Sequence, residues 1–148
     1  MPSLHEAIAT GARSESEVWA RSLRGAPDWE PVFSPLVPGE LALGLETVYE
    51  AYLVHYGRPQ LFAAPDADEA VLLGDYLYAH GLVRIAEAGG VRAVAAMSDL
   101  IARCAALRAD GAPGDGEAWV DAARALGGEP DDDAVMRALE RHSARVAA

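Results

Sequence analysis

The chain contains a single cysteine and no lysine among its 148 residues. One cysteine, Cys104, can form neither an intramolecular disulfide nor a zinc site built from several cysteines. Cys104 falls on an apolar helical stripe, so we expect it in the core and not as a nucleophile. Without lysine, the chain has no side chain that could form a Schiff base or replace the phosphate-binding lysine of a P-loop.

Long apolar runs and positive charge are also scarce. No apolar run approaches the roughly 18 residues that a membrane-spanning helix needs, so we expect no membrane insertion. The first residues lack the basic and then apolar pattern of a signal peptide, which favours a cytoplasmic location. The 23 acidic residues and 12 arginines give a formal net charge of −11. Such a chain lacks the basic surface of a nucleic-acid-binding protein, and an anionic membrane repels it.

The residues that are present predict an all-α fold. Apolar residues recur with a period near 3.6, alanine and leucine are frequent, and alternating runs are few. We expect one domain over residues 1–148, folded as a bundle of about six or seven helices. The predicted helices span about residues 4–24 (one helix, or two that break at Gly11), 38–56, 66–88, 91–110, 117–126 and 131–146. Three prolines between residues 25 and 37 exclude a regular helix there.

Several helix ends have clear signals. Asp66 can cap the helix at 66–88, and Glu69 follows three residues later, as in a capping box. Gly89 and Gly90 then separate this helix from the next one. We expect Trp119 to be buried by the short helix at 117–126.

The helix at 66–88 carries an unusual carboxylate. On a helical wheel Asp75 lies among apolar positions, which are Val71, Leu72, Tyr78, Ala79 and Leu82. A carboxylate on an apolar face is costly unless another group satisfies it. A hydrogen bond inside the fold, a contact across an oligomer interface and a ligand pocket would each satisfy Asp75.

Gly74 and Gly81 lie on a second face of the same helix, seven residues apart. Each glycine costs about 1 kcal/mol relative to alanine inside a helix, so a packing reason is expected. Small residues in register allow another helix to approach closely. This helix is therefore either the central helix of the bundle or one shared with a partner, and we expect it to form the main oligomer contact.

The run Ala70-Val-Leu-Leu-Gly-Asp-Tyr-Leu-Tyr-Ala79 resembles a helix of the all-α polyprenyl diphosphate synthases. In that family a second helix follows after a short turn, as residues 91–110 do here, and the resemblance covers about 40 of the 148 residues. The family's catalytic subunits hold magnesium and a diphosphate with two DDxxD motifs. The acidic triplet Asp131-Asp132-Asp133 fails this motif, because Val135 or Met136 occupies the position of the third aspartate. The chain thus resembles the small non-catalytic subunit of heterodimeric synthases, which supports a catalytic partner and helps set product length.

All the tyrosines fall on the helices at 38–56 and 66–88, namely Tyr49, Tyr52, Tyr56, Tyr76 and Tyr78. If these helices pack antiparallel, the rings could line a common cleft; ordinary aromatic core packing is the alternative. His55 and His80 belong to the same helices, but no HExxH motif or histidine pair predicts a metal site. His5 and His142 are expected in solvent.

Three functions are compatible with these features. The first is a non-catalytic subunit of a prenyl diphosphate synthase, bound to a larger catalytic partner. The second is a stand-alone homodimer of unknown role that would bind a small apolar ligand between the tyrosine-rich helices. The third is a small enzyme that uses Asp75, a tyrosine and a histidine for acid–base chemistry. No complete catalytic signature is present, so we expect no catalysis by the isolated chain and neither a cofactor nor a metal.

Overall fold

The computed structural model describes residues 2–25 and 27–146, which form six α-helices and two short 3-10 helices. This confirms the predicted all-α fold. The elements are α1 (Leu4–Glu15), α2 (Glu17–Ser22), η1 (Ser34–Leu36), η2 (Gly39–Leu41), α3 (Ala42–Tyr56), α4 (Ala67–Ala109), α5 (Asp115–Ala125) and α6 (Asp132–Val146). No helix in the described part of the chain is long and apolar enough to span a bilayer.

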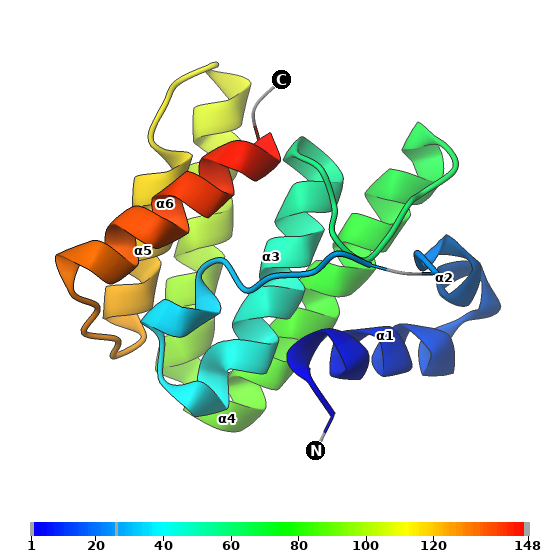
Figure 1. Ribbon diagram of the computed structural model, residues 1–148, viewed down its shortest axis with the longest axis horizontal. Coiled ribbons are helices and arrows are strands. Elements are labelled where there is room, and N and C mark those ends of the chain that lie inside the picture. The colour runs from blue at the N-terminus through cyan, green and yellow to red at the C-terminus, as the bar shows by residue number, and fades with distance from the viewer. Residues whose placement is uncertain (1, 26, 147–148) are drawn as a thin grey trace.

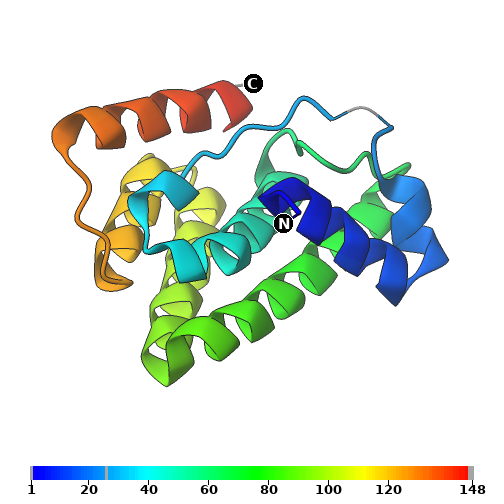
Figure 2. The same ribbon diagram turned by 60° about the horizontal axis from the view of Figure 1, so that its bottom comes forward.

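Helix α4 is sharply bent at Gly90, where the double glycine predicted the end of one helix and the start of the next. Gly90 has φ 71° and ψ −163°, a backbone conformation that is essentially restricted to glycine. The bend divides α4 into a first arm, residues 67–89, and a second arm, residues 91–109, which together form a V (Figures 1 and 2). The predicted cap is also present, since the Asp66 carboxylate accepts a hydrogen bond from the amide of Glu69 at 2.9 Å.

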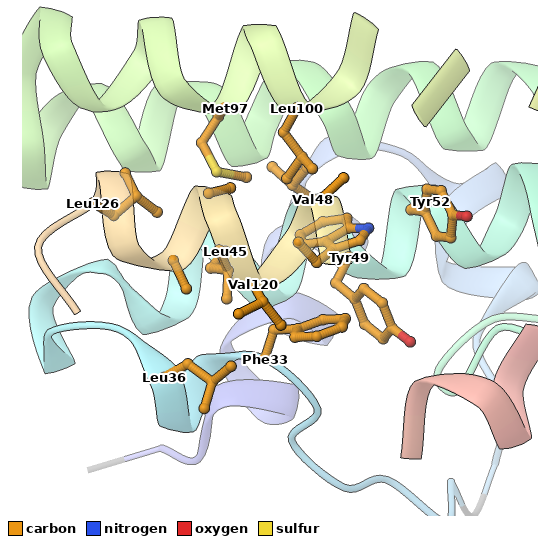
Figure 3. Close-up of a cluster of buried hydrophobic side chains, with 14 of the residues drawn as sticks. Phe33, Leu36, Leu45, Val48, Tyr49, Tyr52, Met97, Leu100, Val120 and Leu126 are labelled. Atoms are coloured by element: carbon orange, nitrogen blue, oxygen red, sulfur yellow. The ribbon is translucent and has the colours of Figure 1, made fainter. Parts of the chain in front are cut away.

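The central helix of the bundle is α3. Its residues from Gly44 to Leu53 are all buried. It packs against both arms of α4, while α5, α6 and the segment before α3 cover its other side (Figure 1). Figure 3 shows this core, in which Met97 and Leu100 of the second arm meet side chains of α3 and α5. Trp119 is 1% exposed, as predicted.

The break in the N-terminal segment lies at Ser16 and not at Gly11. The Ser16 hydroxyl accepts a hydrogen bond from the amide of Val18 at 3.1 Å and caps α2. Gly11 lies inside α1, where an added Cβ would be 2.8 Å from Nη2 of Arg84. Gly11 therefore allows α1 to approach α4 and does not end a helix.

Candidate functional site

The largest cluster of polar side chains joins α3, α4, α5 and α6 around one carboxylate. Oδ2 of Asp115 accepts hydrogen bonds from Nη2 of Arg108 and from Nε2 of His142, both at 2.9 Å. The hydroxyl of Tyr52 also donates to this oxygen. Arg108 in turn donates to the Tyr52 oxygen through Nε at 3.0 Å and Nη2 at 2.8 Å. The chain of contacts ends at the Tyr49 hydroxyl, which lies 2.8 Å from Nδ1 of His142.

The charges in this network are well defined. Burial by itself raises the pKa of Asp115, but hydrogen bonds from Tyr52 and His142 and the charge of Arg108 lower it to about 2. Burial also lowers the pKa of His142 below its ordinary value, although the nearby Asp115 opposes this shift. At neutral pH the imidazole is therefore neutral, with its proton on Nε2 facing the carboxylate and Nδ1 free to accept from Tyr49. Burial raises the pKa of both tyrosines, so they remain protonated.

A tyrosine–histidine–carboxylate chain could relay a proton, but its reactive groups are inaccessible. Tyr49, Tyr52 and His142 are 0%, 1% and 3% exposed. A shallow depression of about 370 Å³ beside α5 reaches only Arg108 and Asp115 at the edge of the network. Because the accessible Asp115 already accepts three hydrogen bonds, the arrangement suits a clamp that holds α5 and α6 on α3 better than an acid–base catalyst.

The prediction that His142 lies in solvent is wrong. Its position offered a signal, because His142 falls four residues after Ala138 and seven after Val135, on the inward stripe of α6. A histidine on such a stripe is expected to be buried with it.

A buried carboxylate on α3 holds the segment before that helix. Glu46 is 1% exposed, and its Oε1 accepts the backbone amides of Val32 at 3.1 Å and Ser34 at 3.0 Å. Burial raises the pKa of Glu46, and these hydrogen bonds lower it in part. Glu46 thus fixes a proline-rich loop that has few backbone partners of its own.

Glu50 lies one turn later on α3 and holds the segment after this helix by accepting hydrogen bonds from its backbone amides. It is 2% exposed and accepts the amides of Gln60 and Leu61, both at 2.9 Å. Burial raises the pKa of Glu50 to about 7, against the opposing effect of these hydrogen bonds. Both glutamates have amide partners, and no group of three or more potential metal ligands occurs in the described ranges.

Gly74 and Gly81 face α3 of the same chain. An added Cβ at Gly74 would collide with the ring of His55, and one at Gly81 would lie 2.6 Å from Cγ2 of Val48. The close helix approach that the glycines predicted is therefore the contact between α3 and the first arm of α4. The expectation that a second chain fills the space beside them is corrected, because α3 occupies it.

Asp75 is largely exposed to solvent and lies beside His55, near the end of α3. Its side chain is 67% exposed, and Oδ1 lies 3.6 Å from Nε2 of His55. The predicted apolar surroundings are present, since Val71 and Leu72 are 53% and 60% exposed beside it. The burial cost expected for this carboxylate does not arise within the single chain. Leu82, another of its predicted neighbours, is half-buried and packs against the core.

The tyrosines do not line one cleft. Tyr49 and Tyr52 point toward α5 and α6, and the ring of Tyr56 lies 5.1 Å from that of Tyr52. Tyr78 is half-buried and stacks on His55 with ring centroids 5.2 Å apart. Tyr76 lies elsewhere, stacked between other aromatic rings, those of Trp19 and His80. Tyr49, Tyr52, Tyr56 and Tyr78 therefore belong to one hydrophobic cluster as ordinary core packing, and Tyr76 belongs to a second cluster.

An exposed apolar surface remains on the first arm of α4. We call it the outer face, and it consists of Asp68, Val71, Leu72, Asp75, Ala79 and Val83, all exposed. It lies opposite Leu73 and Leu77, which face the core. An exposed apolar patch on a rigid helix is typical of an interaction surface.

Comparisons with known protein families, with curated proteins and with solved structures give no match to this chain, so its function is inferred from its own geometry.

Proposed function

We propose that the chain is a non-catalytic helical subunit that supports a larger prenyl or polyprenyl diphosphate synthase subunit. The observation that carries this proposal is the exposed apolar outer face. Four of its six residues lie in the run at residues 70–79, whose sequence resembles the synthase family. A helix that is apolar on both sides is normally covered on both sides. Here α3 covers one side, and the partner subunit covers the other.

The positions of the acidic residues support a non-catalytic role. Glu46 and Glu50 are buried and accept backbone amides, and Asp115 belongs to the clamp. In the acidic triplet, Oδ1 of Asp131 accepts the amide of Ala134 at 2.8 Å, which is the geometry of a helix cap. Carboxylates occupied in this way are poor ligands for a magnesium–diphosphate complex.

The test is co-expression with a catalytic synthase subunit that carries both DDxxD motifs. We expect a complex by size-exclusion chromatography with light scattering, and a changed product length relative to the catalytic subunit alone. Leu72→Glu should abolish the complex, since it replaces the most exposed large apolar side chain of the outer face with a carboxylate. Met136→Glu is the matched control, because Met136 is also 60% exposed but lies on α6.

Two results would count against the proposal. If the wild-type chain leaves the mass and the products of the synthase subunit unchanged, the chain has a different partner. If the isolated wild-type chain has twice the monomer mass and Leu72→Glu restores the monomer, the outer face joins two copies, as in a stand-alone homodimer.

A further inference from the structure

We infer that the outer face accepts a helix that carries two arginines or lysines, one opposite Asp68 and one opposite Asp75, and that it rejects a second copy of this chain. The inference rests on the proposed function, because it specifies the chemistry of the partner at the same surface. It follows from the charges on and around the outer face.

Both charged residues of the outer face are acidic. Asp68 and Asp75 are exposed among valine, leucine and alanine side chains. The single arginine of the first arm, Arg84, points to the other side of the helix. Its Nη1 donates to Oγ1 of Thr47 at 3.0 Å and its Nη2 to the carbonyl of Ala7 at 3.4 Å. No cation of this arm is therefore placed to neutralise the two aspartates.

Contacts inside the chain leave Asp75 able to bind another group. Nε2 of His55 is 3.6 Å away, which is longer than a hydrogen bond. With 67% of its side chain exposed, the carboxylate can still accept the paired hydrogen bonds of a guanidinium.

A second copy of the chain is expected to bind the outer face poorly. Two outer faces in contact would enclose four aspartates and no arginine from either first arm. Each chain also carries a formal net charge of −11. Like charges that are brought together at an interface oppose association and select against the wrong partner.

The spacing of the aspartates defines the partner further. Asp68 and Asp75 are seven residues apart, which is two helical turns or about 10 Å along the axis. A partner helix packed alongside meets both carboxylates if it has cations seven residues apart within an apolar stripe, because the aspartates lie between Val71 and Leu72 on the helix surface. The apolar stripe contacts Val71, Leu72 and Val83, and the cations fix orientation and register.

Two designed peptides test this inference on the full chain. Both are amphipathic helices with the same leucine stripe; one has arginines seven residues apart within the stripe, and the other has glutamates there. By calorimetry we expect the arginine peptide to bind and the glutamate peptide to bind at least about tenfold more weakly. The Asp68→Asn, Asp75→Asn double variant should lose this discrimination. Asp99→Asn, at an exposed position of the second arm, should keep it.

Sedimentation completes the test. We expect the wild-type chain to be monomeric and the Asp68→Asn, Asp75→Asn variant to self-associate more strongly, since the repulsive charges are gone. Equal binding of the two peptides, or a wild-type dimer that Leu72→Glu dissociates, would overturn the inference. If the peptides are distinguished but no synthase subunit binds, the inference holds and the proposed function fails. If Leu72→Glu prevents synthase binding but the two peptides bind equally well, the proposed function holds and the inference about the partner's cations fails.

Discussion

Nε2 of His142 lies 2.9 Å from Oδ2 of Asp115, and this contact connects α6 to the first turn of α5. The other ring nitrogen of His142 lies 2.8 Å from the hydroxyl of Tyr49 on α3. One buried imidazole thus links three helices. Arg108 of α4 joins them through the same Asp115 oxygen.

Replacing Asp115 by asparagine should destabilise the fold. An asparagine cannot satisfy Arg108, Tyr52 and His142 together, and partners left unsatisfied in a largely buried site cost about 2–3 kcal/mol. Urea unfolding measures the change. The matched control is Asp121→Asn, which breaks the contact between Asp121 and Arg103 at 3.0 Å. Because these side chains are 59% and 51% exposed, we expect a loss below about 1 kcal/mol. Equal losses in the two variants would show that the network is not a clamp.

The same network predicts sensitivity to acid. The pKa of His142 is lowered in the folded state, so its contribution to stability is complete above about pH 6.5 and is lost as the pH falls below that value. The pKa of Asp115 is about 2 when folded, so its contribution is lost between its ordinary value of 3.8 and that pH. The measurement is the free energy of unfolding against pH for the wild type and His142→Gln. The difference between the two should shrink on acidification from about pH 7 to pH 5. A constant difference over this range contradicts the prediction.

Glu50 should show the opposite pH dependence. Its pKa is about 7 in the folded state, above its ordinary value of 4.5, because the carboxylate is buried. Its contribution to stability is therefore full below about pH 4.5 and is lost as the pH rises through about 7. Carbon-13 NMR of the glutamate carboxyl groups measures this directly. We expect a resonance that titrates near pH 7 and is missing in Glu50→Gln. A Glu50 resonance with a midpoint near 4.5 would refute the prediction.

The sequence predicted those features that depend on neighbouring residues along the chain. The cap at Asp66 and the bend at Gly90 follow from local backbone chemistry, which acts the same way in any helical fold. The apolar neighbours of Asp75 follow from the 3.6-residue period, although the period did not show that they are exposed. The burial of Trp119 follows from its size and the apolar residues beside it.

The clamp could not be predicted in the same way, because its members come from four helices. Tyr52 and Asp115 are separated by 63 residues and meet only when α3 and α5 pack together. The burial of Glu46 and Glu50 has only a weak signal in the sequence. They occur one turn apart on a helix that is otherwise largely apolar, and burial of the whole helix buries them too. The sequence could not show whether Gly74 and Gly81 face α3 or a second chain, because either neighbour would explain small residues at these positions.

Gly81→Ala should destabilise the fold although alanine is the better helix former. The new Cβ would lie 2.6 Å from Cγ2 and 3.0 Å from the amide nitrogen of Val48, and 3.2 Å from the carbonyl oxygen of Gly44. The backbone atoms cannot yield without separating α3 from α4, so we expect a loss of about 1–3 kcal/mol in urea unfolding. Gly39→Ala is the control, since its Cβ would meet nothing within 4 Å. A Gly81→Ala variant as stable as the control would mean that the two helices are not in close contact.

Gly90→Ala tests the bend of α4 independently of packing. An added Cβ there would meet nothing within 4 Å, so the substitution introduces no clash with another part of the described chain. The cost must come from the backbone, because φ 71° with ψ −163° is essentially closed to residues that have a Cβ. We expect a loss of about 1–3 kcal/mol in the free energy of unfolding.

Asparagine distinguishes backbone strain from other causes at this position. It tolerates the left-handed helical region, where ψ is near +47°, but Gly90 lies far from that value. Gly90→Asn should therefore be no more stable than Gly90→Ala. If either variant is as stable as the wild type, the two arms can join without the bend at residue 90. The V that holds α3 would then depend on side-chain packing and not on this glycine.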